Sequence, residues 1–158
     1  MPEYDFNAAV REHQPKLYRT ACFLAGDRRE GGELFQDALL EAWQNWDEAA
    51  APDPVFPWLC GILIHRYEQR QRGRKPAAAK PAAGAQRDSQ TALLWEALDG
   101  LQPKQRGMLV LRYAEDMSVE QIAETLRESP ATVKSRLGEA HAQAGARLRT
   151  AGIGKPRP

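Results

Sequence analysis

Apolar side chains recur at helical spacing along most of this chain, and almost no segment alternates apolar and polar residues as a strand would. Residues three, four and seven positions apart lie on one face of a helix. The clearest stripes are Leu17, Ala21 and Leu24; Phe35, Leu39, Trp43 and Trp46; and Val133, Leu137, Ala140, Ala144 and Leu148. The spacing therefore predicts an all-α fold.

One stretch without large apolar side chains divides these helical segments. Residues 74–90 (RKPAAAKPAAGAQRDSQ) are rich in alanine, proline, glycine and charge. Such a segment cannot bury enough apolar surface to offset the entropy lost on ordering it. The sequence thus predicts a small helical domain of three to four helices over 1–73, a flexible linker over 74–90, a four-helix domain over 91–150 and a disordered tail over 151–158.

Charge is distributed unevenly between these parts. Residues 1–72 contain 8 basic and 12 acidic side chains, whereas residues 73–90 contain 4 basic and 1 acidic. This asymmetry indicates local basic patches and a separate surface for a protein partner, not a chain coated in nucleic acid.

The most specific motif lies at residues 118–137, SVEQIAETLRESPATVKSRL. Ser118 and Gln121 have the spacing of a capping box, and Ser129-Pro130 places an N-cap serine before a proline that starts a second helix. The residues expected to pack these two helices together are Ile122, Ala123, Leu126 and Val133. The pattern predicts a helix-turn-helix, whose second helix enters the major groove of DNA. The alternative is a helical hairpin with a solvated charged face.

Short polar and basic side chains gather at the start of the predicted second helix. Such side chains suit contacts with phosphates and base edges. The residues predicted to bind DNA are Ser129, Pro130, Thr132, Lys134, Ser135 and Arg136.

Residues 97–137, which contain this motif, resemble region 4 of extracytoplasmic-function (ECF) sigma factors of the sigma-70 family. The LxPxxRxxLxLRY stretch at 101–113 is more particular to sigma factors than the helix-turn-helix alone. The resemblance implies recognition of the −35 promoter element. It also implies docking on the flap of the polymerase β subunit, where Arg106 and Arg112 are the expected contacts.

The first half resembles sigma region 2 independently. Residues 18–43 are similar to regions 2.1–2.2, whose helix binds the β′ clamp helices of core RNA polymerase in that family. The resemblance assigns polymerase binding to Glu33, Leu34, Gln36, Asp37 and Leu40. A solvated helix face is the alternative interpretation for this segment taken alone.

Residues 57–75 resemble regions 2.3–2.4, which capture unstacked bases of the −10 element together with the preceding loop. Melted bases need an apolar pocket and a basic track, and stacking stabilises each base by roughly 1–3 kcal/mol. The residues assigned to the −10 element are Trp58, His65, Arg66, Arg70 and Arg72. Trp58 is also a candidate core residue, and the loop at 47–57 is a further candidate for the base pocket.

Several positions depart from the family pattern. Gly31 and Gly32 each weaken a helix by roughly 1 kcal/mol relative to alanine, so that helix is expected to begin late. Arg127 stands where glycine normally permits a positive φ, and Glu128 stands where an apolar residue would pack. Glu139 and the following His141 replace a basic stretch, so Glu139 is expected to repel the DNA backbone.

The expected function is therefore that of an ECF-type sigma factor, which binds core RNA polymerase and directs transcription initiation at promoters. Promoter DNA, polymerase and an anti-sigma factor are its expected partners. The departures suggest an alternative, a sigma-like regulatory protein with reduced DNA affinity that competes for an anti-sigma factor or for polymerase.

Other classes of protein fit the sequence less well. The three histidines are scattered, and neither metal-ligand spacing nor a glycine-rich phosphate loop occurs, so no enzyme activity, metal or cofactor is expected. No apolar run approaches the roughly 20 residues of a membrane span, and the start lacks the features of a signal peptide. Cys22 and Cys60 are expected to be buried, reduced thiols of a cytoplasmic protein.

Overall fold

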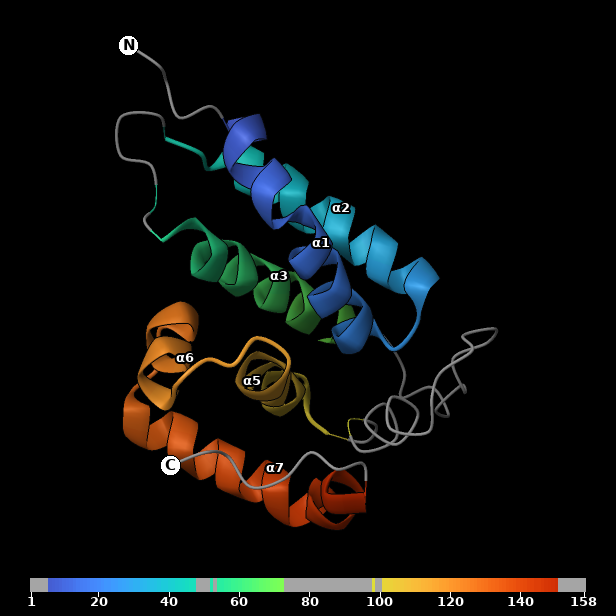
Figure 1. The fold of residues 1–158 in the computed structure, drawn as a ribbon, viewed down its shortest axis with the longest axis vertical. Coiled ribbons are helices and arrows are strands. Elements are labelled where there is room, and N and C mark those ends of the chain that lie inside the picture. The colour runs from blue at the N-terminus through green and yellow to red at the C-terminus, as the bar shows by residue number, and fades with distance from the viewer. Residues whose placement is uncertain (1–5, 48–51, 53, 73–97, 99–100, 151–158) are drawn as a thin grey trace.

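The computed structural model describes residues 6–47, 52, 54–72, 98 and 101–150, with the backbone alone over 144–150. Its elements are the helices α1 (Phe6–Ala25), α2 (Arg28–Gln44), α3 (Val55–Arg72), α5 (Pro103–Tyr113), α6 (Val119–Leu126) and α7 (Pro130–Thr150). Within these ranges there is no strand, and the predicted all-α fold is confirmed (Figure 1).

Helices α1, α2 and α3 form a bundle over residues 6–72, which we call the front half. Leu17 and Leu24 of α1 fill its centre with Leu34 of α2 and Leu59 and Leu63 of α3, and each of the five is at most 1% exposed. The stripe predicted on α1 therefore faces the core.

The core-facing side of α2 differs from the stripe predicted for it. Leu34, Ala38 and Ala42 are buried, whereas Trp43 is 62% exposed. Small residues four positions apart let α2 lie close to its neighbours, and the larger Trp43 points to solvent. The apolar spacing predicted the helix correctly but assigned Trp43 to the wrong side of it.

Helix α2 does not begin late, although it contains two adjacent glycines. It starts at Arg28, directly after the N-cap Asp27, whose Oδ1 accepts a 2.7 Å hydrogen bond from the Glu30 amide. Gly31 lies against Cys22 of α1, where an added Cβ would be 2.7 Å from both Cα and Sγ of the cysteine. Gly31 is thus the residue that lets α1 and α2 approach closely.

Helices α5, α6 and α7 belong to the rear half, which comprises the described residues from 98 onward. Its large buried side chains include Met108, Leu109, Leu111, Ile122 and Val133. Ser118 Oγ accepts from the Gln121 amide, and Gln121 Oε1 accepts from the Ser118 amide, so the predicted capping box is confirmed.

The turn between α6 and α7 has the geometry of a Schellman motif. Arg127 adopts φ 56° and ψ 46°, and the Glu128 amide donates to the Ala123 carbonyl at 2.9 Å. The position predicted to need a positive φ therefore has one, and an arginine occupies it.

Arg127→Gly is expected to stabilise the chain by up to about 1 kcal/mol. A side chain in the left-handed conformation costs roughly 1–2 kcal/mol, from which the greater backbone entropy of unfolded glycine is subtracted. Urea denaturation measures the change, and Arg127→Ala is the control. An equal increase in stability in Arg127→Ala would show that removing the arginine side chain, and not relieving the left-handed backbone conformation, stabilises the chain.

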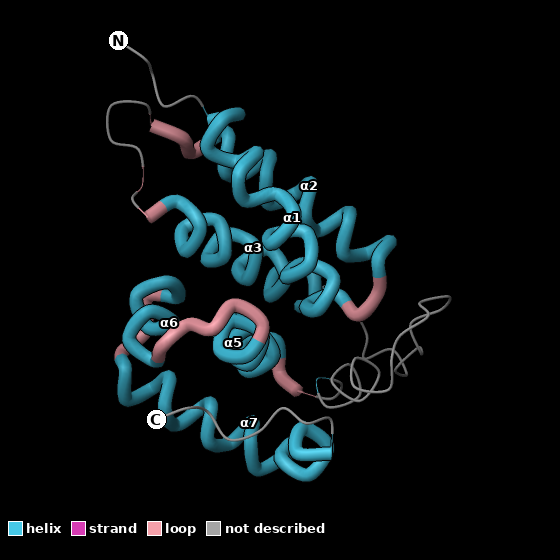
Figure 2. The backbone as a smooth tube through the Cα atoms, viewed as in Figure 1, coloured by secondary structure: helices cyan, strands magenta, loops and turns pink. Residues whose placement is uncertain are grey.

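The two halves are packed against each other. One cluster of buried apolar residues extends through both, and α5 lies between α3 and α7 (Figure 2). The predicted linker at 74–90, the first part of the helix predicted around Leu94, and the predicted tail at 151–158 lie outside the described residues. The division into domains at 73 and 91 therefore stays a prediction.

Both cysteines are free and buried, as expected. Burial raises the pKa of the Cys22 thiol and raises that of Cys60 further. None of the described helices combines the length and the apolar character needed to cross a membrane.

Candidate nucleic-acid interface

The residues predicted to bind DNA through the helix-turn-helix gather at the N-terminal end of α7. Ser129 Oγ accepts from the Thr132 amide at 3.1 Å, which makes Ser129 the N-cap, and α7 begins at Pro130 as predicted. Lys134 and Ser135 are exposed, whereas Thr132 and Arg136 are half-buried. Ile122, Ala123, Val133 and Leu137 are at most 5% exposed and hold α6 against α7. The scaffold thus presents this end of α7 outward.

Glu128, in the turn before α7, forms an ion pair. Its Oε1 is 2.6 Å from Lys104 Nζ of α5, and this hydrogen bond holds the pKa of the Glu128 carboxyl below its usual value. Glu128 thus contacts α5 through an ion pair at the position where an apolar side chain would pack. This ion pair links the turn to α5.

Glu139 and His141 both contact α5. Glu139 Oε2 accepts a hydrogen bond from Gln105 Nε2 at 3.1 Å, and His141 Nε2 is hydrogen-bonded to the Tyr113 hydroxyl. Burial lowers the pKa of the His141 imidazole. Glu139 is nevertheless exposed, so the expectation that it repels the DNA backbone stays a prediction.

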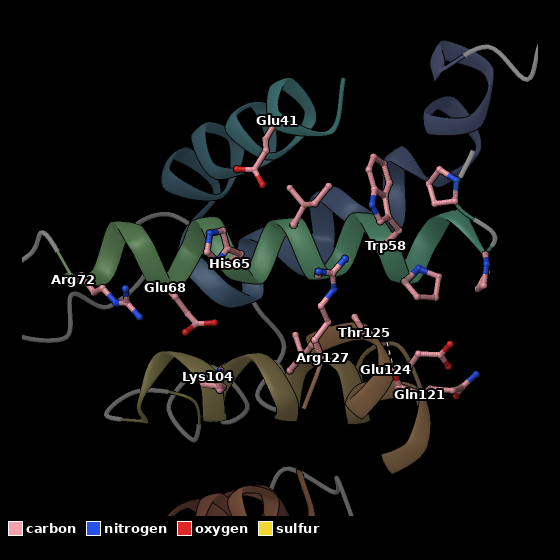
Figure 3. Close-up of a pocket in the computed structure, with 16 residues that line it drawn as sticks. Glu41, Trp58, His65, Glu68, Arg72, Lys104, Gln121, Glu124, Thr125 and Arg127 are labelled. Atoms are coloured by element: carbon pink, nitrogen blue, oxygen red, sulfur yellow. Dashed lines mark hydrogen bonds between the residues drawn. The ribbon is translucent and has the colours of Figure 1, made fainter. Parts of the chain in front are cut away.

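Three of the five residues assigned to the −10 element line a cleft between α3 and α6, which we call the inter-half cleft. Trp58, His65 and Arg72 of α3 lie on one side, with Thr125 and Arg127 on the other (Figure 3). Its volume is about 820 Å³, and its lining also includes prolines from the segment before α3 and the acidic Glu41, Glu68 and Glu124. Of the loop at 47–57, residues 48–51 and 53 lie outside the described residues.

Trp58 also has a structural role. Its ring is half-buried and meets Trp46 edge-on, with centroids 5.9 Å apart. Both interpretations of this residue are therefore compatible with its position, because one part of the ring packs and another part borders the cleft.

Arg66 and Arg70, assigned to the same element, are instead directed at α2. Arg66 is paired with Glu41, and Arg70 binds Asp37 at 2.9 Å and Glu33 at 3.1 Å. Arg66 and Arg70 therefore pair with acidic side chains of α2. Two of these acidic residues, Glu33 and Asp37, were predicted to bind polymerase.

The exposed side of α2 forms a mixed surface. Gln36 is exposed, and Leu40 and Trp43 expose 55% and 62% of their surfaces. We call Gln36, Leu40 and Trp43 the α2 patch. The sequence did not assign Trp43 to a binding site, although its position three residues after Leu40 places both on one side of a helix.

Two residues predicted to contact polymerase are buried, and the expectation of direct contact needs correction for them in this conformation. Leu34 is 1% exposed and belongs to the core. Arg106 is 6% exposed, and its guanidinium donates to the Phe23 carbonyl at 2.7 and 2.9 Å and to the Leu98 carbonyl at 3.1 Å. Arg112 is half-buried and donates to the Met117 carbonyl.

Comparison with known families accounts for both halves. Residues 9–76 match Sigma-70 region 2, and residues 91–142 match Sigma-70, region 4. The chain belongs to the sigma-70 family. The ECF-type resemblance predicted from the sequence is thereby confirmed across both halves of this sigma factor.

Individual relatives cover most of the chain. The sigma factor is 34% identical over 147 residues to the RNA polymerase sigma-E factor of Streptomyces avermitilis. The matched residues cover 88% of this chain and 82% of that protein. It is 28% identical over 143 residues to the ECF RNA polymerase sigma factor SigL of Mycobacterium tuberculosis, spanning 82% of this chain and 81% of SigL.

The fold is similar to that of a solved sigma factor. RpoE of Bartonella quintana, determined in complex with the anti-sigma factor NepR, superimposes with a TM-score of 0.66 at 24% identity, covering 90% of this chain and 98% of RpoE. At this identity the likeness concerns the fold.

Proposed function

We propose that this sigma factor binds core RNA polymerase and directs initiation at promoters, with region 4 at the −35 element and region 2 at the −10 element. The observation that supports it best is the helix-turn-helix with an exposed, basic α7 N-terminus, within a chain that matches both sigma regions in order. A helix in this position enters the major groove with its first turns against base edges.

In region 4, the exposed start of α7 supplies the contacts. Ser129 and Thr132 suit hydrogen bonds to phosphates, and the N-terminal end of a helix favours negative charge. Lys134 and Arg136 add positive charge one turn further along. Phosphate contacts set the register of the protein on the duplex, and the side chains that reach base edges choose the sequence.

Lys134→Ala and Arg136→Ala are each expected to weaken binding to a −35 duplex. Affinity falls with salt, and the slope of its logarithm against the logarithm of the salt concentration is negative. Each variant should make this slope shallower by about one, because one fewer phosphate is neutralised. Fluorescence anisotropy at several salt concentrations measures both quantities. Arg29→Ala is the matched control, because its side chain is 90% exposed on α2. An unchanged slope in both α7 variants would exclude these residues from the DNA surface.

In region 2, one surface would bind polymerase and another would bind the −10 element. The α2 patch would dock on the β′ clamp helices, with Glu33 and Asp37 at its rim. Trp58, His65 and Arg72 would meet the melted −10 strand, because an aromatic ring beside basic side chains suits unstacked bases. Arg112 stays assigned to the β flap.

The remaining assignments follow from this role. The chain itself would not be catalytic, since polymerase performs the chemistry. Because polymerase and the chromosome lie in the bacterial cytoplasm, the proposal places the protein there. An anti-sigma factor is a proposed partner, supported by the similar fold of RpoE, which was solved in complex with one.

The alternative of eroded DNA affinity loses its support in the structure. It depended on positions 127, 128, 139 and 141. Glu128, Glu139 and His141 all contact α5, and Arg127 occupies the conformation that the turn requires. These departures therefore contribute contacts within the rear half.

A further inference from the structure

Glu128 is the departure from the family pattern that lies nearest in the chain to the start of α7. It immediately precedes the N-cap Ser129, at a position where an apolar side chain would pack. A carboxylate beside a helix that is proposed to meet phosphates should weaken DNA binding, because like charges repel each other. The surroundings of Glu128 indicate a different role.

Lys104 of α5 fixes the position of the Glu128 side chain. Its Nζ lies 2.6 Å from Glu128 Oε1, and the two side chains are only 29% and 24% exposed. Hydrogen bonds between two ions are shorter and stronger than those between neutral groups. Since α5 also packs against α7, the carboxylate is held in one orientation beside the second helix of the helix-turn-helix. The bond to Lys104 uses Oε1, and a carboxylate can accept at its second oxygen as well.

Arg136 is the basic residue of α7 whose side chain extends toward this turn. It follows Ser129 by seven positions and Thr132 by four, and these spacings place all three residues on one face of the helix. Long side chains in a helix lean toward the N-terminus, over the preceding turn. The guanidinium of Arg136 is therefore directed back toward Glu128.

The charges of Glu128 and Arg136 interact. The hydrogen bond from Lys104 is the main cause of the lowered pKa of the Glu128 carboxyl, and the positive charge of Arg136 lowers this pKa further. Arg136 is half-buried, and its Nε is buried without a hydrogen-bond partner among the described residues. A buried donor that lacks a partner destabilises the protein, and the nearby negative charge offsets part of this cost.

We propose that Glu128 is a positioning residue for recognition of the −35 element. Held by Lys104, its carboxylate keeps the Arg136 guanidinium in the orientation in which that group meets a phosphate. The inference rests on the proposed function for the contact between Arg136 and DNA. A side chain that is already ordered loses less conformational entropy when it binds, so the same contact gives a higher affinity.

Lys104 also explains why a carboxylate is tolerated at this position. Its ammonium group compensates the negative charge of Glu128 at 2.6 Å. Two basic groups and one acidic group together keep a net positive charge, so a phosphate that approaches Arg136 still meets an attractive surface.

The sign of the change in affinity distinguishes positioning from simple repulsion. If Glu128 contributed only its charge, Glu128→Gln would strengthen binding to a −35 duplex. If Glu128 positions Arg136, the same substitution should weaken binding by about 3- to 10-fold, because one long side chain must then be ordered on binding. The slope of log affinity against log salt concentration should also become shallower, by up to about one. Fluorescence anisotropy with the full-length chain measures both quantities.

A second variant and a control separate positioning from folding. Glu128→Ile removes the carboxylate and supplies the apolar side chain that the family pattern places there, so it should fold and still bind more weakly than wild type. Glu124→Gln is the matched control, because Glu124 is an exposed carboxylate on α6 of the same helix-turn-helix. The control should leave affinity unchanged or raise it. Circular dichroism verifies that all variants keep their helices.

The decisive comparison uses Arg136→Ala. In this background Glu128→Gln should no longer weaken binding, because the group that Glu128 positions is absent. Equal weakening with and without Arg136 would show that Glu128 acts on the fold, and would overturn the proposal. Wild-type or higher affinity of Glu128→Gln would overturn it as well.

Failure of the positioning role can be distinguished from failure of the proposed function. If Arg136→Ala weakens binding and Glu128→Gln does not, the −35 contact stands and only the positioning role fails. If Arg136→Ala changes neither affinity nor salt slope, Arg136 does not contact DNA. That part of the proposed function then fails, and the role of Glu128 fails with it.

Discussion

Gly31→Ala is expected to destabilise the sigma factor by about 1–3 kcal/mol, the usual cost of overpacking a core. The added methyl would lie 2.7 Å from Cα and Sγ of Cys22 and 3.0 Å from its amide nitrogen. Backbone atoms cannot rotate away as the end of a flexible side chain does, so α1 and α2 would have to separate. The better helix propensity of alanine, roughly 1 kcal/mol, offsets only part of this cost.

The adjacent glycine provides the control. A Cβ added at Gly32 meets only Tyr18 Cε1, at an ordinary contact distance of 3.8 Å. Gly32→Ala is therefore expected to leave stability unchanged or to raise it by up to about 1 kcal/mol. Urea denaturation followed by circular dichroism measures both variants. Similar values for the two alanines would contradict the close packing of α1 on α2.

The double variant Leu40→Ala/Trp43→Ala is expected to weaken binding to core polymerase by at least about 30-fold, corresponding to a hot spot of about 2 kcal/mol or more. Tryptophan is enriched at such hot spots, and these two side chains expose more than half their surfaces on α2. Because neither fills the core, the fold should lose little stability.

Tyr18→Ala is the control for this experiment, because Tyr18 is the other large apolar residue exposed among the described residues, at 38%, and it lies on α1. Labelled sigma factor titrated with core polymerase gives the dissociation constants. If the double variant binds polymerase as tightly as the control does, the α2 patch is not the docking surface.

Local features of the structure could be predicted from the sequence where short-range rules determine them. The capping box at Ser118, the N-cap at Ser129 and the positive φ at Arg127 depend on residues within one or two helical turns. Apolar spacing likewise predicted the helices. These features define the helix-turn-helix, and therefore the location of the predicted DNA contacts.

Features that depend on distant partners could not be predicted in this way. Arg106 is buried because a carbonyl 83 positions earlier accepts from it, and Glu139 accepts a hydrogen bond from Gln105, which lies 34 positions earlier. Gly31 weakens an isolated helix yet is required where α1 crosses α2. Periodicity indicates which side of a helix is apolar, and it does not indicate what covers that side.

Run-off transcription with purified core polymerase, on a library of promoter sequences, measures whether this sigma factor directs initiation. We expect it to produce transcripts from a subset of promoters that share a −10 and a −35 sequence. The Lys134→Ala variant should initiate less efficiently on the same subset. Initiation at no promoter, by a protein that still binds polymerase, would show that the protein does not direct promoter-specific initiation.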